Sequence, residues 1–187
     1  LEEWAMWMDT HPDGLQRITE RDRTNKDSGD EVNASPVGPR VVVIGASHAG
    51  VSFADRLRKN GFVGNILIFD KQVGGPMERP PLSKGFLLGG GESVESKSLL
   101  RQKKWYKTNK VRLKTQSTVH SIDKANQTIT VNNGDIIKYD KLVIASGAVP
   151  KELPSSKNMG NAFVLRQPAD ANAIRQTANN SDSVVII

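Results

Sequence analysis

A glycine-rich turn, Gly45-Ala-Ser-His-Ala-Gly50, is the first segment of the chain whose residue types suggest chemistry. Gly45 lets the backbone turn sharply, a small residue at position 47 lets it approach a pyrophosphate, and Gly50 allows close helix packing. The helix that follows would offer N–H groups and a positive dipole end to phosphate oxygens. We therefore predict dinucleotide binding, although Ser47 replaces the usual middle glycine; a tight turn in an unrelated α/β protein is the alternative. The predicted contacts are Gly45, Ala46, Ser47, His48, Ala49 and Gly50.

The segments around this turn have the pattern of a strand, a helix and a second strand. Residues 41–44 form an apolar run typical of a parallel strand that is buried on both faces. Apolar residues then recur at helical spacing until Asn60-Gly61, which is a helix-stop signal. A second apolar run at 66–69 ends at Asp70, 25 residues after Gly45. An acid at that strand end is what the ribose hydroxyls of a dinucleotide need.

A second candidate is the segment Arg79-Pro-Pro-Leu-Ser-Lys84. The two prolines fix an extended entry, and Pro81 can start a short helix over 82–88, which the glycines at 89–91 would break. A lysine just inside such a constrained turn can be held against a ligand. Lys84 is therefore a candidate site residue, with a solvated surface lysine as the alternative.

The rest of the chain predicts further strands and helices. The basic stretch 97–114 contains Trp105 and Tyr106; we expect a surface helix and a strand, with Trp105 in the core, rather than a nucleic-acid surface. Residues 117–137 alternate like paired strands with a hairpin turn at 132–134. The remaining expectations are a buried strand within 139–147, a short strand at 163–166 and a helix over 168–178.

Composition limits the possible functions. The 187 residues include no Cys, which excludes disulfides, thiolate metal ligands and a Cys nucleophile in this chain and suits a reducing cytoplasm. No apolar run reaches the roughly 20 residues of a membrane helix. Residues 1–40 carry five basic and nine acidic side chains, a net −4, which leaves +10 for residues 41–187. A basic body attracts acidic partners or phosphate ligands, although ordinary surface solvation explains it equally well.

The two ends of the chain differ from its body. Residues 1–39 are too polar to offset their ordering entropy, so we expect a disordered tail or linker there. Residues 183–187, Ser-Val-Val-Ile-Ile, predict a buried strand with nothing after it. We therefore expect the natural protein to be longer.

From Arg40 to Ile187 the order of motifs resembles the FAD-dependent pyridine nucleotide:ferredoxin reductases, including putidaredoxin reductase-like and biphenyl dioxygenase reductase-like proteins, with apoptosis-inducing factor related. The most specific matching element is Arg-Pro-Pro-Leu-Ser-Lys. The other matching segments are 41–52, 139–150 and 165–171. The resemblance implies an α/β, Rossmann-like FAD-binding domain of the glutathione reductase-like superfold, a parallel sheet with a β-meander insertion, over residues 40–182. Residues 183–187 would open an NAD(P)H-binding domain.

The resemblance also implies roles for individual residues. Ala49 would lie under the pyrophosphate, Lys84 would lie near the flavin ring as the catalytic residue, and Arg166 would approach the FAD. Val119 would contact adenine through its backbone. The family's ribose acid falls on Lys71, so either Asp70 replaces it from one position earlier, which we favour, or the contact is lost. The remaining implied cofactor-binding residues are Arg79, Ser146 and Gly147, and no metal site is implied.

The implied activity is electron transfer from NAD(P)H through FAD to an acidic [2Fe-2S] ferredoxin that serves an oxygenase or cytochrome P450. Related flavin peroxidases place a His in the glycine-rich turn to assist a Cys, but this chain has no Cys. His48 is therefore expected to contact solvent or backbone. Two alternatives remain open: a non-catalytic binding role like that of apoptosis-inducing factor, and an NADH-dependent flavin oxidase without a protein partner.

Overall fold

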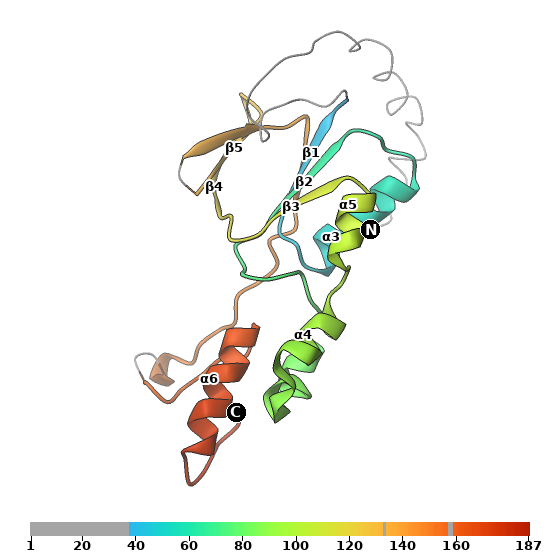
Figure 1. Ribbon diagram of the computed structural model, residues 1–187. Helices are drawn as coiled ribbons and strands as arrows, with labels where there is room; N and C mark the ends of the chain where they lie inside the picture. The colour runs from blue at the N-terminus through green and yellow to red at the C-terminus, as the bar shows by residue number, and fades with distance from the viewer. Residues whose placement is uncertain (1–37, 133, 157–158) are drawn as a thin grey trace. The chain divides into compact units, whose positions relative to one another are not determined.

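The computed structural model describes residues 38–132, 134–156 and 159–187, and these form two compact units (Figure 1). Unit 1 contains the described residues up to Gly74 together with 103–145. Unit 2 contains residues 75–102 and the described residues from Ser146 to Ile187. Each unit is described by itself below. The expected tail at 1–39 lies outside the described residues except for its last two positions.

Unit 1 is built on a four-stranded parallel sheet in the order β3–β2–β1–β7. The strands are β1 (Arg40–Ile44), β2 (Asn65–Phe69), β3 (Val111–Lys114) and β7 (Lys141–Ile144). Helix α3 (His48–Lys59) connects β1 to β2, which pair in parallel from Arg40↔Asn65 to Ile44↔Phe69. The predicted strand–helix–strand unit is therefore confirmed. Its centre is dry, since Val42, Val43 and Ile66 are each 0% exposed.

Helix α3 begins and ends where its sequence predicts. Ser47 precedes it in an extended conformation, and Asn60 follows its last residue with an N–H that donates to the Arg56 carbonyl. Gly61 then adopts a φ of 86°, a left-handed conformation that glycine adopts without strain. The helix buries one face against the sheet, formed by Gly50, Val51, Ala54 and Leu57.

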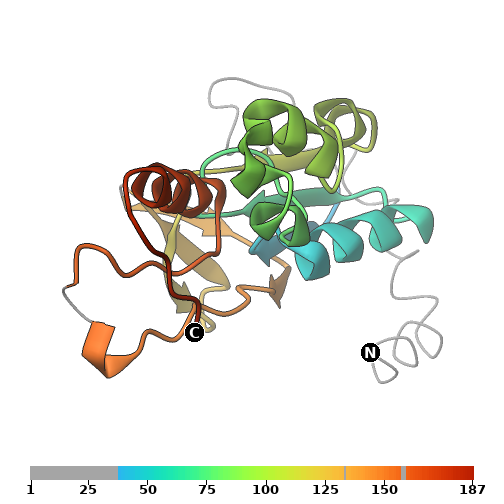
Figure 2. The same ribbon diagram turned by 90° about the horizontal axis from the view of Figure 1, so that it is seen from below.

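A three-stranded antiparallel meander covers the other face of the parallel sheet. It contains β4 (Val119–Asp123), β5 (Thr128–Val131) and β6 (Asp135–Lys138) in that order. Helices α3 and α5 (Lys103–Thr108) lie on the opposite side (Figures 1 and 2). Unit 1 thus has three layers, which confirms the expected α/β sheet with a meander. The core between the two sheets consists of Val42, Leu67, Phe69, Ile129, Val131, Ile137 and Tyr139.

Unit 2 is helical and has a smaller core. Its elements are η1 (Pro80–Ser83), η2 (Phe86–Gly90), α4 (Gly91–Ser98), η3 (Pro154–Ser156) and α6 (Pro168–Asn179). Leu82, Phe86 and Ala171 are buried together, with Met77, Leu87, Val94 and Leu165 packed around them. The sequence predicts helix α6 to within one residue. Pro168 marks its start, because proline fits the first position of a helix, where the backbone N–H needs no partner within the helix. No helix in the described ranges is long and apolar enough to cross a membrane.

Three expectations about burial and helix continuity are wrong. Tyr106, at 8% exposed, is the core residue of α5, whereas Trp105 is only half-buried. The helix expected over 82–88 is two short turns, interrupted at Lys84 (φ −123°, ψ −111°), and the chain becomes helical again from Gly91. Strand β7 is half-exposed because it lies at an edge of the sheet, with β1 as its partner.

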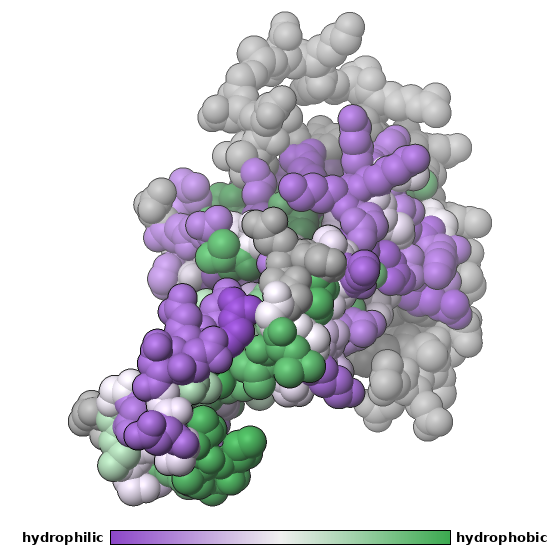
Figure 3. All heavy atoms as spheres, turned by 60° about the horizontal axis from the view of Figure 1, so that its bottom comes forward, coloured by the Kyte–Doolittle hydropathy of each residue, from purple (hydrophilic) through white to green (hydrophobic). Residues whose placement is uncertain are grey.

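Two further predicted strands do not form in the described structure. Residues 163–166 and 183–187 are not paired with any described strand, and pairing is what defines a strand. Val184, Val185, Ile186 and Ile187 are 60–99% exposed. Figure 3 shows hydrophobic side chains on the surface of one face of the molecule. The assignment of residues 183–187 to a second nucleotide-binding domain remains a prediction.

Candidate cofactor site

Both ends of the glycine-rich turn require glycine, Gly45 for its backbone conformation and Gly50 for lack of space. Gly45 has a φ of 100°, and its N–H donates to the Phe69 carbonyl at 2.8 Å. A Cβ on Gly50 would lie 2.0 Å from the Gly45 carbonyl oxygen and 3.2 Å from Val43 Cγ1. No side chain fits there without moving the backbone. The turn is therefore fixed to the end of β1 with α3 packed directly upon it.

The start of α3 is suited to an anion. Ser47 makes no side-chain capping hydrogen bond, and the first turn has no acidic residue. The Val51 N–H donates to the Ser47 carbonyl at 3.0 Å, which is the first backbone hydrogen bond of the helix. The N–H groups of residues 48–50 come before it and have no carbonyl partner within the helix. His48 and Ala49 are exposed at this end. These N–H groups have no acceptor among the described residues, and together with the positive end of the 12-residue helix they suit a pyrophosphate.

Asp70 holds the turn from the neighbouring strand. Its Oδ2 accepts a hydrogen bond from the Ala46 N–H at 2.6 Å, and its Oδ1 accepts one from the Gln72 N–H at 2.8 Å. The sequence suggested a ribose contact for Asp70 but not this bond to the turn. A carboxylate has about four acceptor positions, so it keeps capacity for ribose hydroxyls. Lys71 is exposed, and its ammonium can only donate.

Val119 belongs to a segment tied to the same strand end. The Ser117 N–H donates to the Asp70 carbonyl at 2.8 Å, two residues before Val119. Val119 pairs with Val131, and the register shifts before Ser121. Asn132 supports this corner, since its side chain accepts from the Thr118 N–H and donates to the Gln116 carbonyl, both at 2.7 Å. From the sequence, Asn132 was interpreted only as a turn residue.

In unit 2 the structure brings Arg79, Arg166 and Gly147 together. Arg79 Nη1 donates to the Arg166 carbonyl at 2.7 Å. The Arg166 N–H donates to Asp170 Oδ2 at 2.8 Å, at the start of α6. A Cβ on Gly147 would lie 3.6 Å from Arg166 Nη2, so the guanidinium lies beside this glycine. The Arg166 backbone is thus held on both sides.

Lys84 lies on the surface of unit 2, at the end of η1. Its N–H donates to the Pro81 carbonyl at 3.1 Å, and its carbonyl accepts from the Leu88 N–H at 3.0 Å. Leu82 and Phe86, two residues to either side, are each 2% exposed. The Lys84 side chain is left exposed while its neighbours anchor the turn.

The sequence-predicted residues therefore form two sets. Unit 1 contains the turn, Asp70, Lys71 and Val119, whereas unit 2 contains Arg79, Lys84, Ser146, Gly147 and Arg166. Ser146 is exposed and follows β7 after one intervening residue. Among the described residues there is no cluster of His, Asp or Glu able to hold a metal ion. The roles of the residues of both sets remain predictions.

The chain matches known proteins over most of its length. A sequence profile described as pyridine nucleotide-disulphide oxidoreductase matches residues 39–187. The chain is 32% identical over 148 residues to a rubredoxin-NAD(+) reductase of Pseudomonas putida, and 33% identical over 148 residues to one of Ectopseudomonas oleovorans. Each match spans 79% of this chain but only 38% of the relative.

Solved structures show the same relationship. The putidaredoxin reductase–putidaredoxin complex matches with a TM-score of 0.68 and 31% identity, over 74% of this chain and 34% of that one. The ferredoxin reductase of the CYP199A2 system from Rhodopseudomonas palustris matches with a TM-score of 0.69 and 29% identity, over 76% and 35%. The chain spans about a third of the length of these structures.

Proposed function

The chain belongs to the pyridine nucleotide-disulphide oxidoreductase family, and from this we propose that the whole protein is an FAD-dependent oxidoreductase that passes electrons from NAD(P)H to a [2Fe-2S] ferredoxin. Members of this family typically use FAD and NAD(P)H. One observation carries the FAD assignment: a turn with no room for a Cβ at Gly50 opens a helix whose first N–H groups have no acceptor in the described part of the chain and so can bind a pyrophosphate.

The residues of this chain would have distinct tasks toward the cofactor. The first turn of α3 would bind the pyrophosphate, and Asp70 would hold that turn in place while accepting from the ribose. Arg166 would bring a guanidinium to the cofactor and Lys84 an ammonium to the flavin ring. When bound, the flavin supplies the redox chemistry, accepting a hydride and releasing single electrons. The protein's contribution is binding, orientation and electrostatics.

A ferredoxin acceptor is supported by three observations. Similar proteins include a reductase complexed with putidaredoxin and the ferredoxin reductase of a CYP199A2 system. The chain has no Cys, so dithiol chemistry by its own residues is excluded. The basic balance of residues 41–187 would favour an acidic acceptor by steering its approach.

The test is to purify the whole protein and measure bound FAD, then NAD(P)H oxidation with and without a [2Fe-2S] ferredoxin. We expect yellow protein and oxidation that is stimulated by the ferredoxin. Colourless protein that takes up no FAD would refute the proposal. Equal oxygen uptake with and without ferredoxin would favour a flavin oxidase. DNA retention that falls with salt, without NAD(P)H oxidation, would favour a non-catalytic binding role.

A further inference from the structure

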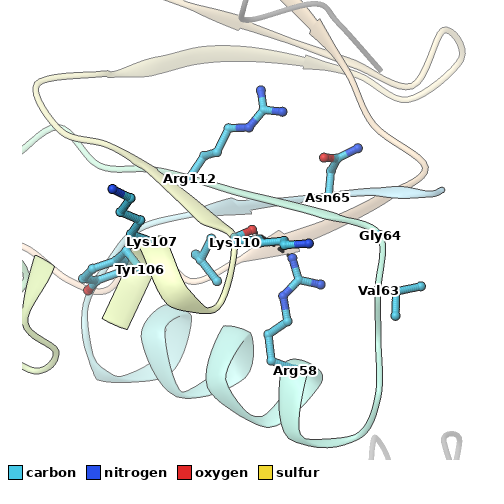
Figure 4. A pocket seen from close by; sticks show the side chains of 9 residues that line it. Arg58, Val63, Gly64, Asn65, Tyr106, Lys107, Lys110 and Arg112 are labelled. Carbon is cyan, nitrogen blue, oxygen red and sulfur yellow. Dashed lines mark hydrogen bonds between the residues drawn. The ribbon is translucent and has the colours of Figure 1, made fainter. Parts of the chain in front are cut away.

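A pocket of about 510 Å³ lies in unit 1, away from the glycine-rich turn. It is formed where α3 ends, where β2 and β3 begin and where α5 turns into β3 (Figure 4). The glycine-rich turn follows the carboxyl end of β1. Because the strands are parallel and the pocket lies where β2 and β3 begin, the pocket is at the opposite end of the strands. A strand of five residues spans roughly 16 Å. The pocket is therefore separate from the candidate cofactor site.

Four of the residues that line this pocket are cationic: Arg58, Lys107, Lys110 and Arg112. Arg112 pairs with Leu67, whose side chain packs against the meander, so the Arg112 side chain lies on the other face of the sheet from α3. No Asp or Glu is among the pocket's lining residues in the described part of the chain. Within the described ranges, the ion pair on α3 between Asp55 Oδ2 and Lys59 Nζ, at 3.0 Å, involves neither lysine of the pocket. The positive charges of Arg58, Lys107 and Lys110 repel each other across the pocket, and a bound anion relieves that repulsion.

One of the four cations is fixed in place. Arg58 donates to three backbone carbonyls: Nε to Asn109 at 2.7 Å, Nη1 to Phe62 at 2.6 Å and Nη2 to Lys110 at 2.9 Å. Its guanidinium also lies 5.5 Å from the centre of the Phe62 ring. Partial burial lowers the pKa of Arg58 from its usual value. The three hydrogen bonds nevertheless fix the guanidinium beside the pocket.

The two lysines complete the basic wall. Lys107 is on α5, and Lys110 is in the tight turn before β3, where it has a φ of 49°. Both side chains are exposed, and Figure 4 shows the Arg58 side chain extending from α3 toward Lys110. Compact ammonium groups on flexible stems suit phosphate oxygens.

The shape and the aromatic residues favour a small ligand over a nucleic acid. Binding of single strands uses exposed aromatic faces on which bases stack. Here Tyr106 is 8% exposed and its ring meets that of Trp105 edge-on, with centroids 5.1 Å apart. The volume lies within the range of about 300–1,000 Å³ typical of small-molecule sites. We propose that this pocket binds a compact phosphate-bearing anion, such as pyrophosphate or the phosphates of a nucleotide.

The test is calorimetric titration of the protein with inorganic pyrophosphate, with saturating FAD present so that the glycine-rich turn does not compete. The Lys107→Gln/Lys110→Gln variant should bind pyrophosphate at least tenfold more weakly. The matched control is Lys124→Gln/Lys138→Gln, which removes two exposed lysines of the meander from the same unit and should change affinity less than threefold. Lys107→Gln alone, on an exposed helix position, gives a second variant that retains the fold.

Comparing the two double variants locates the pyrophosphate site whether or not FAD binds, because neither Lys107 nor Lys110 lies at the glycine-rich turn. Equal affinities for the two double variants would overturn the proposal, as would a wild-type protein that binds no pyrophosphate. Tighter binding of a single-stranded oligonucleotide, weakened equally by both double variants, would also overturn it in favour of a nucleic-acid surface.

Discussion

Units 1 and 2 present their candidate cofactor residues in different ways. In unit 1 the site is mainly backbone: a turn closed by Gly45 and Gly50 and bonded to Asp70, beside strands that are almost completely buried. In unit 2 the site is mainly side chains, Arg79, Lys84 and Arg166, on short turns over a small core. Cofactor binding by the unit 1 site should be lost when a Cβ is added to one of its glycines. Cofactor binding by the unit 2 site should weaken when a charge is removed, while the fold remains.

The largest effect should come from adding a side chain inside the turn. Gly50→Val would place a Cβ 2.0 Å from the Gly45 oxygen, so the turn must open and FAD binding should be lost. We expect a cost of about 3 kcal/mol or more in unfolding free energy. Gly160→Val, where nothing lies within 4 Å, is the control and should bind FAD normally. Urea unfolding and FAD titration measure both quantities; normal binding by Gly50→Val would contradict the backbone interpretation.

Removing the support of the turn should have the next largest effect. Asp70→Ala leaves the N–H of Ala46, a residue only 2% exposed, without its acceptor. A buried donor left unsatisfied costs about 1–3 kcal/mol. Asp70→Asn keeps one acceptor oxygen and should lose less. Urea unfolding of the two variants would show this order, and equal stability of Asp70→Ala and wild type would exclude a clamping role.

In unit 2, Arg166→Ala should lower affinity without lowering stability. A charge-assisted contact to the cofactor is worth about 1.5–3 kcal/mol, or at least a roughly tenfold change in the FAD dissociation constant. Arg175→Ala on α6, where the guanidinium donates to Asn172 Oδ1 at 3.4 Å, should leave the FAD dissociation constant near wild type. Flavin fluorescence during titration of apo protein measures both. Matching affinities for the two variants would remove Arg166 from the site.

A smaller effect is expected at Lys84. If its ammonium lies beside the flavin ring, it favours the added negative charge of reduction, and Lys84→Met should lower the reduction potential. A shift of roughly 10–30 mV corresponds to about 0.5–1.4 kcal/mol for two electrons. Lys97→Met, an exposed lysine at the end of α4, provides the control. Identical potentials for the two variants would make Lys84 a solvated lysine.

The smallest expected effect concerns Asp123 in the meander, which belongs to neither set of candidate cofactor residues. Bonds from the Asn126 backbone and side chain hold the pKa of Asp123 below its usual value. A depressed folded-state pKa stabilises the protein above the unfolded pKa, and that contribution is lost as pH falls through the folded one. Asn126→Ala should therefore raise the Asp123 pKa measured by NMR. An unchanged value would show that the side-chain bond is absent in solution.

The sequence was informative where structure is local. The strand–helix–strand unit and α6 follow from apolar periodicity together with glycine, asparagine and proline signals, and both formed within a residue or two. The position of β7 at a sheet edge could not be read from its apolar run, because strand order depends on tertiary pairing. On the six-residue α5, periodicity is too short to tell Trp105 from Tyr106.

The same limit applies to the candidate site. The glycine spacing predicts the turn because each glycine meets a local steric requirement, either of a sharp turn or of close helix packing. The bond from Ala46 to Asp70 joins residues 24 apart, and the one from Arg79 to Arg166 joins residues 87 apart. Neither is visible until the chain has folded. The basic pocket likewise draws its cations from separate elements, so the sequence indicates only part of it, as a basic stretch.

The pairing of β1 with β7 has a consequence for how the chain folds. The Arg40 N–H donates a hydrogen bond to Asp140 Oδ2, a residue 100 positions later in the sequence, whereas β5 and β6 are joined by a turn of a few residues. Closing a loop of that length costs roughly 4 kcal/mol in chain entropy before any contact repays it. Synthesis at about 5–20 residues per second leaves this edge of β1 unpaired for roughly 5–20 s. During that interval β2 and α3 are the described elements that cover β1.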